Sequence, residues 1–128
     1  MSKPERPLRK HVNSDGSFVY VPAAVIIGPD VTIGVRTRFL DKVTIGQGSI
    51  ISQDTIIYQN VVIQNRVTIG AGCIIGHDAL IGHEAIIGEQ SHVTPNATVP
   101  RYWRIPAQSI VNESGGHGAV VLPRHWPK

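Results

Sequence analysis

Residues 56–88 read IIYQNVVIQNRVTIGAGCIIGHDALIGHEAIIG, and an apolar residue recurs in this stretch at every sixth position. The column continues on both sides. Its members are Ile27, Ile33, Phe39, Ile45, Ile51, Ile57, Ile63, Ile69, Ile75, Ile81, Ile87, Val93 and Val99. Small or β-branched residues form a second column four positions further on, and glycine often follows the apolar residue directly. A period of six excludes an α-helix, whose repeat is about 3.6 residues. These residue types instead favour short strands joined by tight turns.

This repeat resembles that of the hexapeptide-repeat superfamily, from about residue 21 to about residue 115. The resemblance implies an all-β fold, a left-handed parallel β-helix with three hexapeptides in each coil. The handedness comes from the resemblance alone, because crossover connections between parallel strands are otherwise right-handed. Residues eighteen apart are then expected to stack about 4.8 Å apart, in about five coils. Each buried apolar residue would lie on another in the next coil and form a continuous core.

Three segments follow from the extent of the repeat. They are a basic, proline-rich N-terminal segment (1–18), the β-helix (19–113) and a C-terminal tail (114–128). The flanking segments are candidates for caps over the exposed ends of the core, or for disorder. The single cysteine, Cys73, excludes an internal disulfide and a multi-cysteine zinc site. Without an apolar N-terminal run we expect a cytoplasmic protein that does not enter a membrane.

The net charge of +3 is concentrated toward the two ends of the chain. No aromatic residues are interleaved with the basic N-terminal residues, so nucleic-acid binding is not expected. Many residues just before the apolar column are also apolar, and in a β-helix they would point outward. They are Ile26, Ile50, Ile56, Val62, Ile74, Leu80, Ile86 and Ile110. Such a surface indicates an oligomer interface. The resemblance implies a homotrimer with sites in the clefts between subunits.

Three histidines lie within residues 76–92, and one interpretation makes them zinc ligands. The run VPRYWRIPAQSIV (99–111) is similar to the end of γ-class carbonic anhydrases, which have this fold. Matching the hexapeptides of that family places its three zinc ligands at Tyr58, His77 and Gly82, so His77 is the only matched ligand. A catalytic zinc site needs three protein ligands. We therefore expect no metal requirement, and an incomplete zinc site is kept as an alternative.

A second interpretation rests on GHEAIIGEQSHVTPNA (82–97), which resembles a motif of the sugar acetyltransferases of this fold, of the sialic-acid O-acetyltransferase type. The resemblance implies that His83 is the general base, Glu84 its partner and His92 a contact to the thioester of acetyl-CoA. The acceptor would be a small molecule with an amine or a hydroxyl. Imidazole titrates near neutral pH, and an adjacent carboxylate can hold its tautomer. No covalent intermediate is required, so Cys73 is expected only to pack in the core.

A third interpretation is a non-catalytic trimeric β-helix scaffold. In this case His77 and His83 simply occupy outward turn positions where any polar residue is accepted. The scaffold hypothesis predicts no binding of acyl-CoA, which separates it from the transferase hypothesis. The identity of the acceptor is left open by the sequence.

Overall fold

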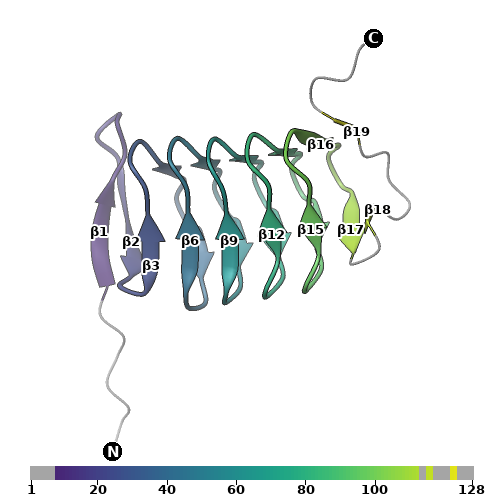
Figure 1. Cartoon of the computed structure of the whole chain (residues 1–128). Coiled ribbons are helices and arrows are strands. Elements are labelled where there is room, and N and C mark those ends of the chain that lie inside the picture. The colour runs from purple at the N-terminus through teal and green to yellow at the C-terminus, as the bar shows by residue number, and fades with distance from the viewer. Residues whose placement is uncertain (1–7, 113–114, 117–121, 124–128) are drawn as a thin grey trace, which may run out of the picture.

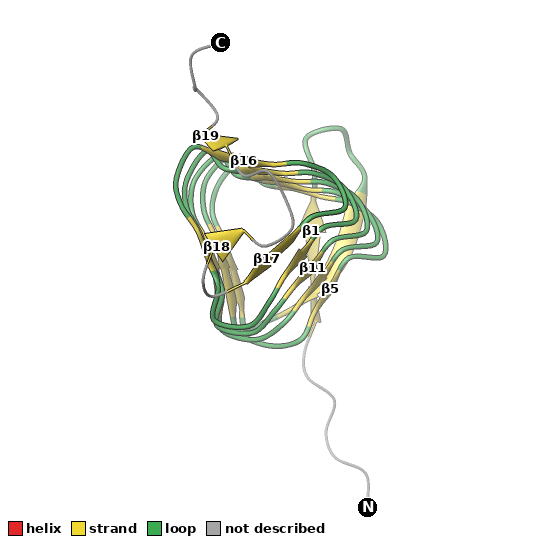
Figure 2. Cartoon of the chain, turned by 90° about the vertical axis from the view of Figure 1, so that its right-hand side faces the viewer, coloured by secondary structure: helices red, strands yellow, loops and turns green. Residues whose placement is uncertain are grey.

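The structure, a computed structural model, describes residues 8–112, 115–116 and 122–123. From residue 25 to residue 112 the chain coils as a left-handed parallel β-helix with a triangular cross-section (Figure 2), and the coils stack along one axis (Figure 1). The all-β fold predicted from the resemblance to the hexapeptide-repeat superfamily is confirmed. No helix long and apolar enough to cross a membrane is found among the residues described. Most of the predicted tail (114–128) and residues 1–7 lie outside the described ranges.

Three parallel sheets form the sides of the triangle, and we name each by its central strand. The β9 sheet contains β3 (Val25–Ile27), β6 (Val43–Ile45), β9 (Val61–Ile63), β12 (Leu80–Ile81) and β15 (Thr98–Val99). The β10 sheet contains β4 (Thr32–Ile33), β7 (Ile50–Ile51), β10 (Thr68–Ile69), β13 (Ile86–Ile87), β16 (Trp103–Ile105) and the antiparallel β19 (Leu122–Pro123). The β11 sheet contains β5 (Arg38–Phe39), β8 (Ile56–Ile57), β11 (Ile74–Ile75), β14 (His92–Val93), β17 (Ile110–Asn112) and the antiparallel β18 (Gly115–Gly116).

The core follows the two columns seen in the sequence. Ile63 is 1% exposed and lies between Ile45 and Ile81, each eighteen residues away. Ile27 is an exception, because it is only partly buried at the end of the stack. Hydroxyl groups of the second column are also satisfied: Ser49 Oγ donates to the carbonyl of Gln64 at 2.8 Å. A core of this kind tolerates Ser and Thr because their hydroxyls bond to the backbone of the next coil.

The turns require an unusual backbone conformation that the sequence did not indicate. The third residue after the apolar column adopts a positive φ in nearly every hexapeptide. The non-glycine members are Asp30, Arg36, Asp54, Asn60, Arg66, Asp78, Glu84, Gln90, Asn96, Tyr102 and Gln108. Glycine directly after the column has a different cause. A Cβ on Gly82 would lie 2.4 Å from the backbone nitrogen of Arg101 in the next coil. The positive φ at the turns and the close coil spacing together determine where side chains can project.

An antiparallel hairpin of β1 (Leu8–Val12) and β2 (Phe18–Pro22) covers the first coil (Figure 1). It spans the boundary predicted between residues 18 and 19. Alternate side chains of its first half donate hydrogen bonds to backbone carbonyls of that coil: Arg9 to Val25, His11 to Val31, and Asn13 to Ile33. Polar side chains of the hairpin thereby make the hydrogen bonds to the backbone that another coil would otherwise make. An open strand edge is a site of aggregation, and this hairpin closes it.

Candidate functional site

The three histidines project outward from the segment between β11 and β14, with one further coil after it. His77 lies in the corner between β11 and β12, His83 in the next corner, between β12 and β13, and His92 on β14. All three side chains are partly exposed. Their neighbours in the repeat, Ile75, Ile81 and Val93, are fully buried. The core therefore fixes the backbone on which each imidazole is displayed.

A hollow of about 350 Å³ lies over the β11 sheet and the corner that follows it. Its lining residues are Tyr58, Ile74, Gly76, His77, His92 and Pro95. The stacking of coils explains this combination, since Ile74 pairs with His92 in the register of β11 and β14. The lining is mostly apolar, and the two imidazoles are its main polar groups. The structure thus brings His77 and His92 together, while His83 is not among the residues that line this hollow.

His77 has a carboxylate partner within its own turn. Its Nδ1 lies 2.8 Å from Oδ2 of Asp78. A carboxylate only accepts hydrogen bonds, so Nδ1 donates and Nε2 is left for a second partner. Sequence reasoning did not predict this pair. The available signal was a histidine followed at once by an acid, the pattern on which His83 and Glu84 were selected.

The predicted base lies one corner further on. The side-chain oxygen of Gln64 accepts a hydrogen bond from the backbone nitrogen of His83 at 3.1 Å. The ring of His83 packs edge-on against Tyr102, with 5.6 Å between the ring centroids. Glu84 accepts a hydrogen bond from Arg66 Nη2 at 3.0 Å. Arg66 therefore anchors the carboxylate of Glu84 to the preceding coil.

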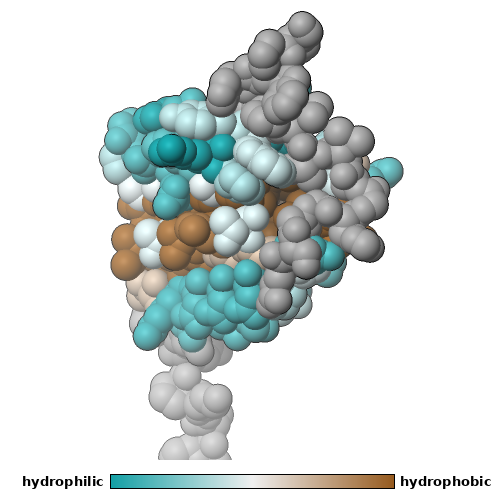
Figure 3. Space-filling model, turned by 45° about the vertical axis from the view of Figure 1, so that its right-hand side comes forward, coloured by the Kyte–Doolittle hydropathy of each residue, from teal (hydrophilic) through white to brown (hydrophobic). Residues whose placement is uncertain are grey.

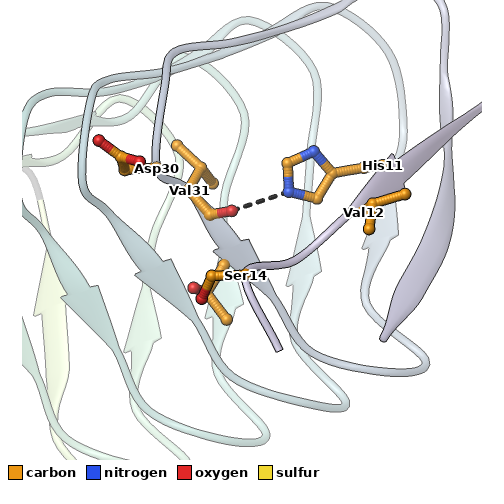
Figure 4. Close-up of a pocket in the computed structure, with 6 residues that line it drawn as sticks. His11, Val12, Ser14, Asp30 and Val31 are labelled. Atoms are coloured by element: carbon orange, nitrogen blue, oxygen red, sulfur yellow. Dashed lines mark hydrogen bonds between the residues drawn. The ribbon is translucent and has the colours of Figure 1, made fainter. Parts of the chain in front are cut away.

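A second hollow, of about 230 Å³, lies at the N-terminal end of the β-helix, between the hairpin and the first coil. Its lining residues are His11, Val12, Ser14, Asp30, Val31 and Thr32. Figure 4 shows the ring of His11 directed at the carbonyl of Val31, and its Nε2 lies 2.8 Å from that oxygen. The imidazole is therefore part of the end cap. We assign this hollow to the cap rather than to a catalytic centre.

Cys73 packs in the core, as its column position indicates. It is fully buried, and its thiol donates to the carbonyl of Gly88 at 3.1 Å. Burial raises the pKa of the Cys73 thiol, which disfavours the thiolate. Its geometry is that of a packing residue. Among the described residues, no group of three or more His, Cys, Asp or Glu side chains could hold a metal ion. Of the three positions matched to zinc ligands, Tyr58 and His77 line the first hollow and Gly82 lies one hexapeptide later.

The family comparison agrees with the repeat. Residues 48–83 match the family described as "Bacterial transferase hexapeptide (six repeats)". The resemblance to the hexapeptide-repeat superfamily is thereby confirmed over these residues. No curated protein matches the chain. The similarity to γ-class carbonic anhydrases stays a prediction.

Several solved structures are similar to the chain. PerB from Caulobacter crescentus, solved with CoA and GDP-perosamine, is 21% identical with a TM-score of 0.48, covering 88% of this chain and 57% of PerB. A hexapeptide-repeat-containing acetyltransferase from Vibrio cholerae is 23% identical with a TM-score of 0.49. The match covers 77% of this chain and 68% of the acetyltransferase. LpxA from Acinetobacter baumannii is 14% identical with a TM-score of 0.46, covering 84% and 76%. The chain thus spans little more than half the length of PerB, and none of these values extends an activity to it.

Proposed function

We propose that this protein transfers an acyl group from acyl-CoA, acetyl-CoA in the simplest case, to a small amine or hydroxyl acceptor. The observation that carries the proposal is the motif of residues 82–97. It presents His83 and His92 on the outside of a rigid β-helix, with Glu84 between them in sequence. Both imidazoles are partly exposed, so both are accessible to a ligand. The match of residues 48–83 to a transferase hexapeptide family points the same way.

The chemistry assigns a distinct role to each side chain. His83 accepts the proton of the acceptor amine or hydroxyl as that atom attacks the thioester carbonyl. The new bond to carbon forms, the carbon–sulfur bond breaks, and the proton passes to the leaving thiolate. Glu84, held by Arg66, stabilises the imidazolium that forms. His92 donates a hydrogen bond to the thioester carbonyl oxygen. The reaction requires no metal and no covalent enzyme intermediate.

A complete site of this kind draws on two copies of the chain. His83 and His92 belong to different sides of the triangle, the corner after β12 and the face of the β11 sheet. They meet most simply in a cleft where the corner of one chain approaches the face of another. The outward apolar residues support such contacts: Ile26 is 65% exposed and Ile50 44%. An apolar band also crosses the face shown in Figure 3, between two rows of hydrophilic side chains. A homotrimer is therefore part of the proposal.

The test is release of free thiol from acetyl-CoA across a panel of amino sugars, with the wild type and two variants. His83→Ala should lower turnover by about two to four powers of ten, the usual range for loss of an acid–base group. Glu84→Gln should lower it less. Gln47→Ala is the matched control, because Gln47 is exposed at the same repeat position of the same corner, two coils away. It should retain wild-type turnover.

Melting temperature provides the check on folding. His83 projects from the core, so His83→Ala should melt within a degree or so of the wild type, as surface substitutions do. Wild-type turnover in His83→Ala would refute the assignment of the base. If the wild type releases no thiol with any acceptor, the transferase proposal fails. The scaffold hypothesis predicts that outcome.

A further inference from the structure

His92 lines the hollow over the β11 sheet, and its position indicates where the acyl group of the substrate would lie. Under the function proposed above, His92 contacts the thioester carbonyl. The carbon chain attached to that carbonyl must then lie within reach of the side chains around His92. Those side chains are Tyr58, Ile74, His77 and Pro95, with bare backbone at Gly76. An acyl chain leaving the thioester therefore meets a mostly apolar surface.

The size of the hollow exceeds what an acetyl group needs. Its volume is about 350 Å³, which lies at the lower end of the range for pockets that hold whole small ligands. Gly76 contributes only backbone to the lining, and the coil spacing requires glycine there, because a Cβ would lie 2.5 Å from the backbone nitrogen of Pro95. A two-carbon acyl group would leave most of this apolar surface in contact with water.

We propose that this hollow is an acyl-chain pocket, and that the protein prefers a short aliphatic acyl thioester longer than acetyl. The inference rests on the proposed function and specifies its donor substrate. Ile74, which pairs with His92 on the neighbouring strand of the same sheet, provides the apolar floor. Tyr58 and Pro95 contribute further apolar contacts. His77, whose Nδ1 is bound to Asp78, adds a second imidazole to the lining.

The expected effect follows from burial of methylene groups. Complete burial of one methylene strengthens binding by about four-fold. The hollow is open on one side, so part of each methylene stays in water. We therefore expect the dissociation constant to fall by about two- to four-fold for each methylene added to the acyl chain. The effect ends when the chain outgrows the hollow.

The experiment is calorimetric titration of the full chain with CoA, acetyl-CoA, butyryl-CoA and hexanoyl-CoA. Ile74→Thr removes apolar surface from the floor while keeping a β-branched residue that the repeat already accepts at the equivalent position of Thr68. Val35→Thr is the matched control, since it also replaces an exposed apolar side chain with threonine but lies in the corner between β4 and β5, outside the hollow. Affinity should rise along the series in the wild type and in Val35→Thr, and should become nearly flat in Ile74→Thr.

A second pair of variants guards against misfolding of Ile74→Thr. Tyr58→Ala should also weaken the binding of hexanoyl-CoA more than the binding of acetyl-CoA. Leu40→Ala, at the same repeat position one coil earlier, should not. Equal affinities for the acetyl, butyryl and hexanoyl esters in the wild type would overturn the acyl-chain pocket and leave the transferase proposal standing. If affinity rises with acyl length equally in the wild type, Ile74→Thr and Tyr58→Ala, the acyl chain binds elsewhere and the assignment of the pocket is overturned. If neither CoA nor any of its esters binds, both proposals fall.

Discussion

Replacing Asn13 with alanine should destabilise the β-helix from its N-terminal end. The side chain of Asn13 is 6% exposed and makes two hydrogen bonds with the backbone of Ile33. Its Oδ1 accepts from the nitrogen of Ile33 and its Nδ2 donates to the carbonyl oxygen, each at 2.9 Å. The amide thus imitates the backbone of a preceding coil. Alanine would leave both groups of the fully buried Ile33 without these partners.

The magnitude follows from the cost of unsatisfied buried groups. Each buried donor or acceptor that loses its partner costs about 1–3 kcal/mol. Two groups therefore give about 2–6 kcal/mol, and water entering at the end of the stack should bring the loss toward the lower limit. The assay is equilibrium urea unfolding followed by circular dichroism at constant protein concentration.

Asn65→Ala is the matched control for Asn13→Ala. Asn65 also accepts a hydrogen bond from a backbone nitrogen, that of Gln47 at 3.0 Å, but both residues are exposed. Water can replace the lost hydrogen bond at an exposed site. The free energy of unfolding of the control should therefore lie within about 0.5 kcal/mol of the wild-type value. If Asn13→Ala loses no more free energy of unfolding than Asn65→Ala, the hairpin does not close the edge of the first coil as described.

Other substitutions and measurements test the core, the coil spacing and the assembly. Ile63→Asp places an unpaired charge in the core and should prevent folding; a stable β-rich circular dichroism spectrum would show that the register is wrong. Gly82→Ala should lower the free energy of unfolding by about 1–3 kcal/mol through its clash with Arg101, and an unchanged urea midpoint would contradict the coil spacing. Cys73 should resist alkylation in the native protein at pH 8, because burial raises the pKa of its thiol; rapid labelling without unfolding would contradict its burial. Sedimentation should give about three times the 13.9 kDa chain mass, whereas a monomer at micromolar concentration would remove the proposed cleft.

The regular part of the fold could be predicted from the sequence because its cause is periodic. Stacking repeats the same environment every eighteen residues, so the residues of the apolar column identify the core directly. The position with positive φ in each turn could not be predicted in this way. Its occupants range from Asp30 to Arg66 and Tyr102, since the conformation is imposed by the coil rather than by one residue type. The end cap was also missed, because a hairpin that imitates a coil through side chains has no period.

The outward placement of the candidate site residues was predictable from the sequence. Sequence reasoning selected His83, Glu84 and His92 from a linear motif, and the structure places all three on the outside of the coils. It did not foresee that His77 and His92 line one hollow. The eighteen-residue register carries some of that information, since it places Ile74 beside His92. The bond between His77 and Asp78 depends on side-chain rotamers, which no sequence pattern specifies.

Binding of acetyl-CoA to the wild-type protein tests the central claim most directly. Titration calorimetry at tens of micromolar protein should give saturable heat. About 1 mM acetyl-CoA should raise the melting temperature, because a ligand that binds only the folded state stabilises it by mass action. The predicted result is a dissociation constant in the micromolar range and a higher melting temperature. The absence of both heat and a thermal shift would contradict the transferase proposal and leave only the β-helix fold.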